Sequence, residues 1–122
     1  MTKAVTILEV DIQATFRKRM YYAAPAIKVV AIPNAARRTR WEAARAKKEG
    51  LATGFPDVMC LGPDGLVAMI EFKAAKGVIS EAQQEWIDLL RRYSFPATVA
   101  RSADEAMAFL RSAGFPVRER AA

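Results

Sequence analysis

Residues 54 to 73 read GFPDVMCLGPDGLVAMIEFK, and this stretch decides the fold of the chain. Two apolar runs, at 58–61 and 66–70, flank the sequence Gly-Pro-Asp-Gly, which favours a tight reversal of the backbone. The pattern predicts two strands that pair as a β-hairpin. The unbroken apolar character of the second run indicates that this strand is buried.

Charged residues stand at the open end of this hairpin. Asp57 precedes the first strand, and Glu71 and Lys73 follow the second. Because side chains alternate between the faces of a strand, Glu71 and Lys73 share one face and Phe72 points to the other. Pairing brings Asp57 close to Glu71, so two carboxylates and an ammonium group converge. Such a set suits a divalent cation and phosphodiester hydrolysis, but solvated charges at the end of a plain hairpin would give the same pattern.

Five sequence blocks in a fixed order resemble the VRR-NUC domain, a branch of the PD-(D/E)XK nucleases. The blocks are Glu9, IPN at 32–34, GFPD at 54–57, EFK at 71–73 and GVISEAQ at 77–83. The resemblance extends over nearly the whole chain, from about Glu9 to Leu110. One departure is visible, because the family usually has a glycine in the turn before the last core strand, where this chain has YSFP at 93–96.

The resemblance implies an α/β, restriction-endonuclease-like fold, in which helices flank a mixed central sheet in the order α-β-α-β-β-α-β-α. It implies one stand-alone, phage-type domain over residues 1–122, with a core at about 3–112. The expected activity is hydrolysis of DNA phosphodiester bonds with Mg²⁺ or Mn²⁺. The expected substrate is branched DNA such as a Holliday junction, cut by a homodimer. A nucleic-acid-binding domain that kept the fold without catalysis is the alternative.

The same resemblance implies roles for individual residues. The expected catalytic residues are Glu9, Asp57, Glu71, Lys73 and Gln83. Asp57, Glu71 and the backbone carbonyl of Phe72 would hold the metal ion, with Glu9 acting through water or on a second ion. Lys73 would orient a water molecule and help to deprotonate it. Gln83 has two interpretations, since it completes a Ser-x-x-Gln capping box with Ser80 and, in the family, lines the site.

A basic segment at 37–49 (RRTRWEAARAKKE) is predicted to be a helix that either binds DNA phosphates or presents a solvated charged face, and binding is the favoured interpretation. Trp41 would either lie beside the bound DNA or pack into the core. Gly50 and Gly54 bracket the following loop and suit a backbone that approaches DNA or flexes. The complete set of predicted DNA-binding residues is Arg37, Arg38, Arg40, Trp41, Arg45, Lys47, Lys48 and Lys76.

The composition narrows the function classes. A net charge of +6 favours a polyanionic partner. The absence of histidine excludes Ser-His-Asp hydrolysis and zinc sites built on histidine. The single Cys60 is predicted to be a small core residue. No apolar run is long enough for a membrane span and no signal-peptide core is visible, so a cytoplasmic location is expected.

Hydrophobic periodicity predicts the remaining elements. A helix at 3–22 would bury Val5, Leu8, Ile12, Phe16 and Met20. A strand is expected at 27–32, and a second helix at 81–93 would bury Trp86, Leu89, Leu90 and Tyr93. A short strand at 97–100 and a helix from Ser102 to about Ser112 complete the chain, with Phe109 and Leu110 facing inward.

Overall fold

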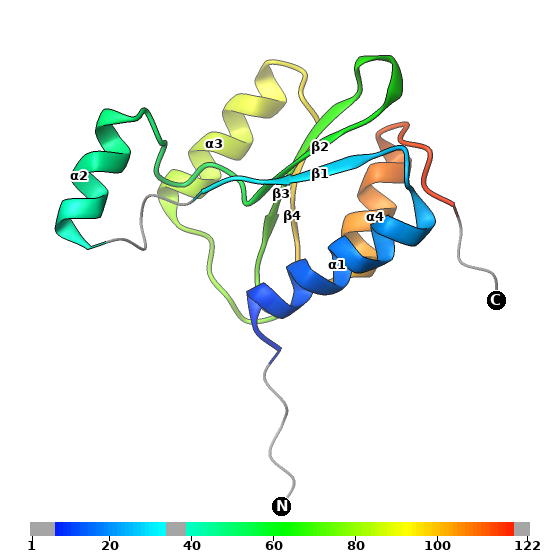
Figure 1. The fold of residues 1–122 in the computed structure, drawn as a ribbon, viewed down its shortest axis with the longest axis horizontal. Helices are drawn as coiled ribbons and strands as arrows, with labels where there is room; N and C mark the ends of the chain where they lie inside the picture. Colours follow the sequence, from blue (N-terminus) through cyan, green and yellow to red (C-terminus); the bar gives the residue numbers. More distant parts are fainter. Residues whose placement is uncertain (1–6, 34–38, 119–122) are drawn as a thin grey trace, which may run out of the picture.

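A four-stranded mixed sheet forms the centre of the molecule (Figure 1). The structure is a computed structural model that describes residues 7–33 and 39–118. The strands lie in the order β1-β2-β3-β4. Their bounds are β1 Lys28–Ala31, β2 Val58–Leu61, β3 Val67–Phe72 and β4 Ala97–Ala100. The strand β2 runs antiparallel to both of its neighbours, β1 and β3, and β4 runs parallel to β3. The predicted α/β class, mixed sheet and order of elements are confirmed.

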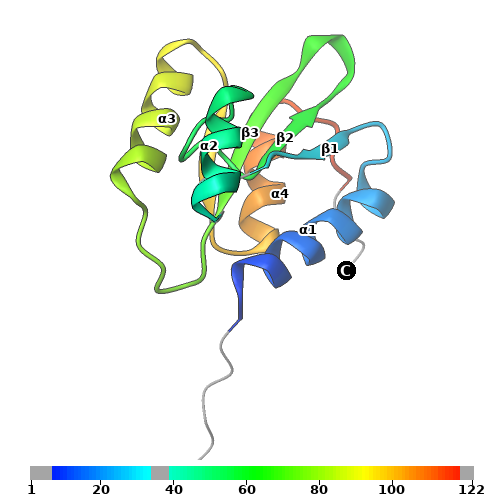
Figure 2. The ribbon, with the colours of Figure 1, turned by 60° about the vertical axis from the view of Figure 1, so that its left-hand side comes forward.

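Helices cover both faces of the sheet, as Figures 1 and 2 show. The helices α1 (Glu9–Ala23) and α4 (Ala103–Ser112) pack on one face, in a core that includes Phe16, Ile70 and Phe72. The helix α3 (Glu81–Arg92) packs on the other face against Met69 and Ala97. Since Ile70 and Phe72 face one core and Met69 the other, the alternation predicted for β3 is confirmed. No helix in the described ranges is long and apolar enough to cross a membrane.

The helix α1 is shorter than predicted at its N-terminus. It begins at Glu9, and residues 7 and 8 precede it in non-helical conformation. Ile12, Phe16 and Met20 are buried as their spacing predicts. The assignment of Leu8 to the buried stripe is wrong, because Leu8 lies outside the helix and is 56% exposed. Val5 lies outside the described residues.

The helix α2 (Arg40–Lys48) stands away from the sheet beside α3 (Figure 1). It begins three residues later than predicted because Thr39 caps it. The Thr39 hydroxyl oxygen accepts from the backbone N–H of Glu42 at 3.2 Å, and the hydroxyl donates to the Glu42 carboxylate at 2.9 Å. Of its described side chains only Ala43 is half-buried, and the others are exposed. The helix is therefore held by its own capping and its connections and buries little against the core.

The buried stripe of α3 differs from the predicted one. Ile87 and Leu90 are its buried residues, whereas Tyr93 is 66% exposed at the C-terminal end. In the turn that follows, before β4, a serine takes the conformation expected of the glycine that the resemblance predicts there. Ser94 takes φ +68°, in the left-handed region that glycine usually occupies, and its N–H donates to the carbonyl of Arg91 at 3.0 Å. A serine in this conformation retains the turn at a cost in strain.

Candidate active site

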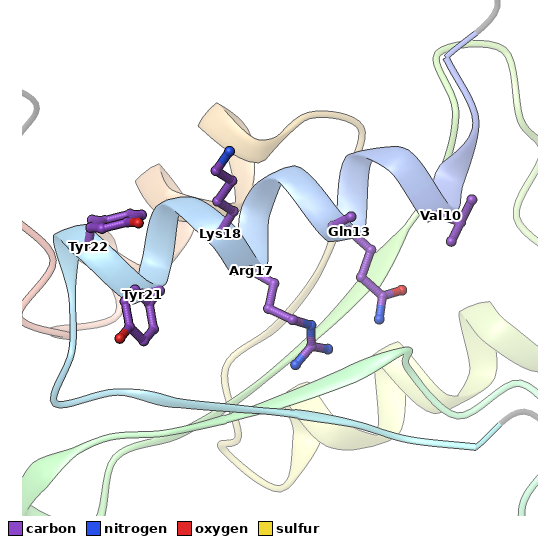
Figure 3. Close-up of a pocket in the computed structure, with 7 residues that line it drawn as sticks. Val10, Gln13, Arg17, Lys18, Tyr21 and Tyr22 are labelled. Atoms are coloured by element: carbon purple, nitrogen blue, oxygen red, sulfur yellow. The ribbon is translucent and has the colours of Figure 1, made fainter.

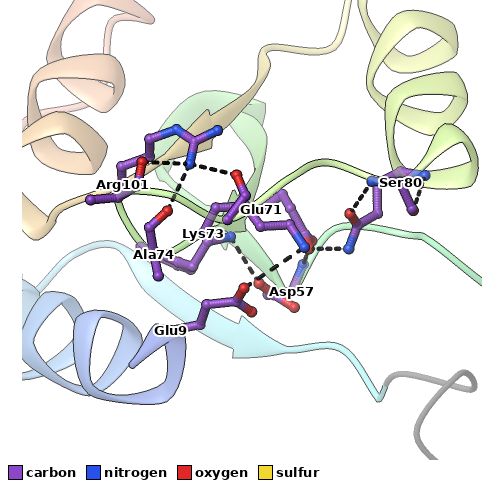
Figure 4. A network of polar contacts seen from close by, with 11 residues as sticks. Glu9, Asp57, Glu71, Lys73, Ala74, Ser80 and Arg101 are labelled. Atoms are coloured by element: carbon purple, nitrogen blue, oxygen red, sulfur yellow. Dashed lines mark hydrogen bonds and ion pairs between the residues drawn. The ribbon is translucent and has the colours of Figure 1, made fainter. Parts of the chain in front are cut away.

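The carboxylates of Asp57 and Glu71 lie side by side at the end of the hairpin (Figure 4). The sheet register pairs Val58 with Ile70, which places Asp57 opposite Glu71. Each carboxylate then accepts a hydrogen bond from the other strand. Asp57 N–H donates to Glu71 Oε2 at 3.1 Å, and Phe72 N–H donates to Asp57 Oδ2 at 2.8 Å. This reciprocal pair extends the ladder through side chains and fixes both acids on a rigid part of the sheet.

Gln83 connects this pair to the start of α3. Its Nε2 donates to Glu71 Oε1 at 2.7 Å, while its Oε1 accepts from the backbone N–H of Ser80 at 2.9 Å. The hydroxyl oxygen of Ser80 accepts in turn from the Gln83 backbone N–H at 3.1 Å, which completes the capping box. The capping box is confirmed, and the other end of the same amide orients the Glu71 carboxylate. The catalytic role of Gln83 stays a prediction.

Glu71 is almost completely buried, with 2% of its surface exposed. Burial, together with the nearby Asp57 carboxylate, raises the pKa of its carboxyl group to about 8. Two contacts lower this pKa, namely the ammonium group of Lys73 and the hydrogen bond from Asp57 N–H. The carboxylate of Glu9 raises it. A buried carboxylate beside a second carboxylate is costly as an anion unless a cation joins it. This donor set of hard oxygens therefore fits a divalent metal ion.

Lys73 and Glu9 complete the polar cluster. Lys73 Nζ lies 3.7 Å from Glu9 Oε1, in an ion pair that joins β3 to the first turn of α1 (Figure 4). Its backbone N–H donates to the carbonyl of Ala100, so β4 holds it in place. Within residues 7–33 and 39–118, no three carboxylate, histidine or cysteine side chains are grouped tightly enough to hold a metal ion. A set of ligands at this site would therefore combine Asp57 and Glu71 with backbone or water oxygens.

Arg101 is a member of the site region that the sequence reading missed. Its Nη1 donates to the backbone carbonyls of Ala74 at 2.7 Å, Gly77 at 2.9 Å and Ala75 at 3.3 Å. The guanidinium thus holds together the loop that leaves Lys73. A signal was available, because Arg101 directly follows the strand predicted at 97–100, and that strand pairs with β3.

Gly54 has a packing role, and the predicted approach of its loop to DNA stays a prediction. Its φ is +85°, and a Cβ atom on it would lie 2.7 Å from the backbone carbonyl carbon of Ala82. This close contact brings the segment leading to Asp57 against the first turn of α3, which carries Gln83. Gly50 also has a positive φ, of +84°, but open space surrounds it.

The predicted DNA-binding residues on α2 are exposed to solvent. Arg40, Arg45, Lys47 and Lys48 are all exposed, and Arg45 forms an ion pair with Glu49 at 3.0 Å. Exposed cations of this kind suit contacts with phosphates. Arg37 and Arg38 lie outside the described residues. Lys76 is exposed in the loop after β3, where it lines a surface hollow of about 490 Å³ with Arg101 and Asp11.

Trp41 does not pack into the core. Its side chain is 72% exposed, and the guanidinium carbon of Arg45 lies 6.0 Å from the centroid of its ring. The interpretation of Trp41 as a core residue is therefore wrong. Its place beside bound DNA remains a prediction.

Cys60 is a core residue, as predicted. It is completely buried in the core between the sheet and α1, and desolvation raises the pKa of its thiol to about 12, with Arg17 opposing this effect. The thiol is therefore protonated at neutral pH and takes no part as a nucleophile.

Comparisons with known proteins identify the family and the fold of the chain. The family profile of the VRR-NUC domain matches residues 5–104. A solved structure described as a VRR_NUC domain protein superposes with a TM-score of 0.68, covering 91% of this chain and 89% of that chain at 21% identity. This second likeness shows a shared fold. A comparison with curated protein sequences gives no match. The chain belongs to the VRR-NUC domain family and has its nuclease-type fold.

Proposed function

We propose that this protein is an endodeoxyribonuclease that hydrolyses phosphodiester bonds with Mg²⁺ or Mn²⁺. The observation that carries the proposal is the Asp57–Glu71 pair. Two carboxylates locked together by reciprocal hydrogen bonds, one of them buried with a raised pKa, form a site for a cation. Membership of a family with a nuclease-type fold supports DNA as the substrate.

Each residue of the proposed active site has its own role. Asp57, Glu71 and the backbone carbonyl of Phe72 would hold the metal ion, and Gln83 keeps Glu71 in its orientation. Lys73 orients a water molecule and helps to deprotonate it, and its ion pair with Glu9 keeps the ammonium group near the carboxylates. A bound divalent ion would neutralise negative charge that develops on the phosphate, which is worth several kcal/mol.

The exposed cations of α2 indicate the class of substrate. The exposed cations of α2 contact phosphates, which carry no base sequence, so the enzyme selects DNA by its shape. We propose branched DNA such as a four-way junction. Symmetric cutting of a junction needs two active sites, and a homodimer supplies both.

Cleavage of supercoiled plasmid tests the catalytic proposal. Nicking should require Mg²⁺ or Mn²⁺ and stop in EDTA. Asp57→Asn should abolish it, because the amide removes the charge that binds the cation. Asp64→Asn is the matched control, since Asp64 is an exposed aspartate in the hairpin turn whose φ of +60° asparagine tolerates. Full activity of purified Asp57→Asn would refute the site, and binding without cutting by the wild type would favour the catalytically silent domain.

Two further measurements test how DNA is bound. Replacing Arg40, Arg45 and Lys48 by alanine should weaken binding to every duplex sequence alike and lower the slope of log K against log salt by about 0.9 per lost contact. An unchanged slope would place the duplex-binding surface elsewhere. Sedimentation at micromolar concentration should give a dimer, and a protein that stays monomeric on DNA would leave nicking of one strand as its activity.

A further inference from the structure

The outer side of α1 carries cations and aromatic rings that the proposed active site does not use. Two adjoining surface hollows of about 480 and 550 Å³ lie along this helix and between it and β1, and Arg17 and Tyr21 line both. Lys18 and Tyr22 line the first hollow, and Lys28 lines the second. Figure 3 shows residues that line the first hollow. We call the two hollows together the α1 groove.

The α1 groove is positively charged. Its lining includes Arg17, Lys18 and Lys28, and none of the described residues that line it is a carboxylate. Arg17 Nη1 donates to the carbonyl of Val29 at 3.0 Å, which fixes the guanidinium between α1 and β1. Because a guanidinium has five N–H donors, this bond leaves donors for a ligand. A polyanion is the complementary occupant.

Two exposed aromatic rings accompany these cations. Tyr21 is 74% exposed and Tyr22 is 73% exposed, and their ring centroids lie 5.1 Å apart with the planes at 85°. Figure 3 shows Tyr21 directed toward β1 and Tyr22 directed away from it. Proteins that hold single strands combine phosphate-binding cations with aromatic rings on which bases stack. In a duplex the bases are already stacked on one another, so exposed rings favour a single strand.

The α1 groove begins next to the proposed active site. Val10, which lines one hollow, follows Glu9 directly on α1. Tyr21 comes twelve residues after Glu9, which corresponds to about 18 Å along a helix that rises 1.5 Å per residue. At the spacing of about 3.4 Å per nucleotide in a stacked strand, this distance holds about five nucleotides. A strand that passes the carboxylates can therefore continue along α1.

We propose that the α1 groove binds a single-stranded arm of the DNA substrate as it leaves the active site. Phosphates lie on Arg17, Lys18 and Lys28, and bases stack on Tyr21 and Tyr22. The direction of the arm rests on the proposed function, whereas the binding of a single strand does not. A second copy of this chain is a poorer occupant, because a two-fold contact would bring the same cations face to face.

Fluorescence anisotropy of labelled oligothymidylate in EDTA tests the α1 groove without cleavage. Tyr21→Ala/Tyr22→Ala should weaken binding by about fivefold to 150-fold for each stacking ring lost. Binding to duplex DNA should weaken less. Lys18→Ala/Lys28→Ala should lower the slope of log K against log salt by about 0.7 per lost contact on a single strand. Thermal melting checks that the variants fold. We expect them to fold, because the replaced side chains are exposed to solvent.

Tyr93→Ala and Arg92→Ala are matched controls, because both residues are exposed at the end of α3 on the other face of the sheet. They should bind oligothymidylate as the wild type does. Equal affinity of the double tyrosine variant and the wild type would overturn the proposal. A double variant that loses self-association and keeps its DNA affinity would assign the groove to a second copy instead. Weakened single-strand binding in a protein that never cuts DNA would support the groove and refute the nuclease.

Discussion

Replacing Glu71 by glutamine should remove a pH dependence of folding stability that the metal-free wild type shows. The carboxyl group of Glu71 has a pKa of about 8 in the folded protein and an ordinary value of 4.5. A raised folded pKa means that the folded state binds the proton more tightly than the unfolded state does. Its stabilising contribution is complete below pH 4.5 and is lost as the pH rises toward 8. The metal-free protein should therefore become less stable over this range.

The two pKa values set the size of the effect. Integrating the difference in proton binding at 1.36 kcal/mol per pKa unit gives a loss of roughly 2 to 3 kcal/mol between pH 5 and pH 7. Solvent screening does not reduce this figure much, because Glu71 is 2% exposed. Glutamine cannot ionise, so the variant lacks this slope. Its free energy of unfolding should also be lower by an amount that does not depend on pH. The amide has one acceptor oxygen, so it cannot accept from both Asp57 N–H and Gln83 Nε2 as the carboxylate does.

Urea unfolding in EDTA at pH 5, 6 and 7 measures the slope directly. Glu85→Gln is the control, because Glu85 is exposed on α3 and its stability curve should run parallel to that of the wild type. Saturating Mg²⁺ should reverse the trend for the wild type and for Glu85→Gln but not for Glu71→Gln, since the metal ion binds the ionised carboxylate and stabilises the folded state more as the pH rises. Parallel curves for Glu71→Gln and the wild type would refute the raised pKa.

Four further substitutions test the segments around the site. Gly54→Ala should cost about 2 to 4 kcal/mol in urea unfolding, because a Cβ would collide with the backbone of α3 at a positive φ. Gly50→Ala, with a similar φ in open space, should cost only about 1 to 2 kcal/mol. Ser94→Gly should stabilise the protein by about 1 kcal/mol, seen as a higher melting temperature, since glycine takes φ +68° without strain. Arg101→Met should lower kcat by about tenfold and change KM little, because it releases the loop after Lys73 and removes no substrate contact; an unchanged kcat would show that this loop holds itself.

The hairpin and the proximity of its two carboxylates could be predicted from the sequence. A short turn joins two apolar runs, and side chains alternate along a strand, so the register that places Asp57 opposite Glu71 follows from local rules. The buried residues Ile12, Phe16 and Met20 of α1 follow from helical periodicity for the same reason. The ordered blocks from Glu9 to Gln83 were sufficient to recognise the family.

The contacts that turn these acids into a site needed the tertiary structure. Gln83 reaches Glu71 across twelve residues of sequence, and Arg101 reaches the loop after Lys73 across more than twenty. No periodicity within one element encodes such contacts, because they depend on where α3 and β4 pack against β3.

The exposure of some aromatic side chains could not be predicted from the local sequence pattern either. Trp41 and Tyr93 have the apolar character of core residues, and only the packing of their helices leaves them in solvent. The sequence by itself determined the elements and the chemical groups at the end of the hairpin, since both depend on neighbours in the chain. The tertiary structure decided how these groups are oriented and which surfaces remain for DNA, because burial and long-range hydrogen bonds arise only when the helices close over the sheet.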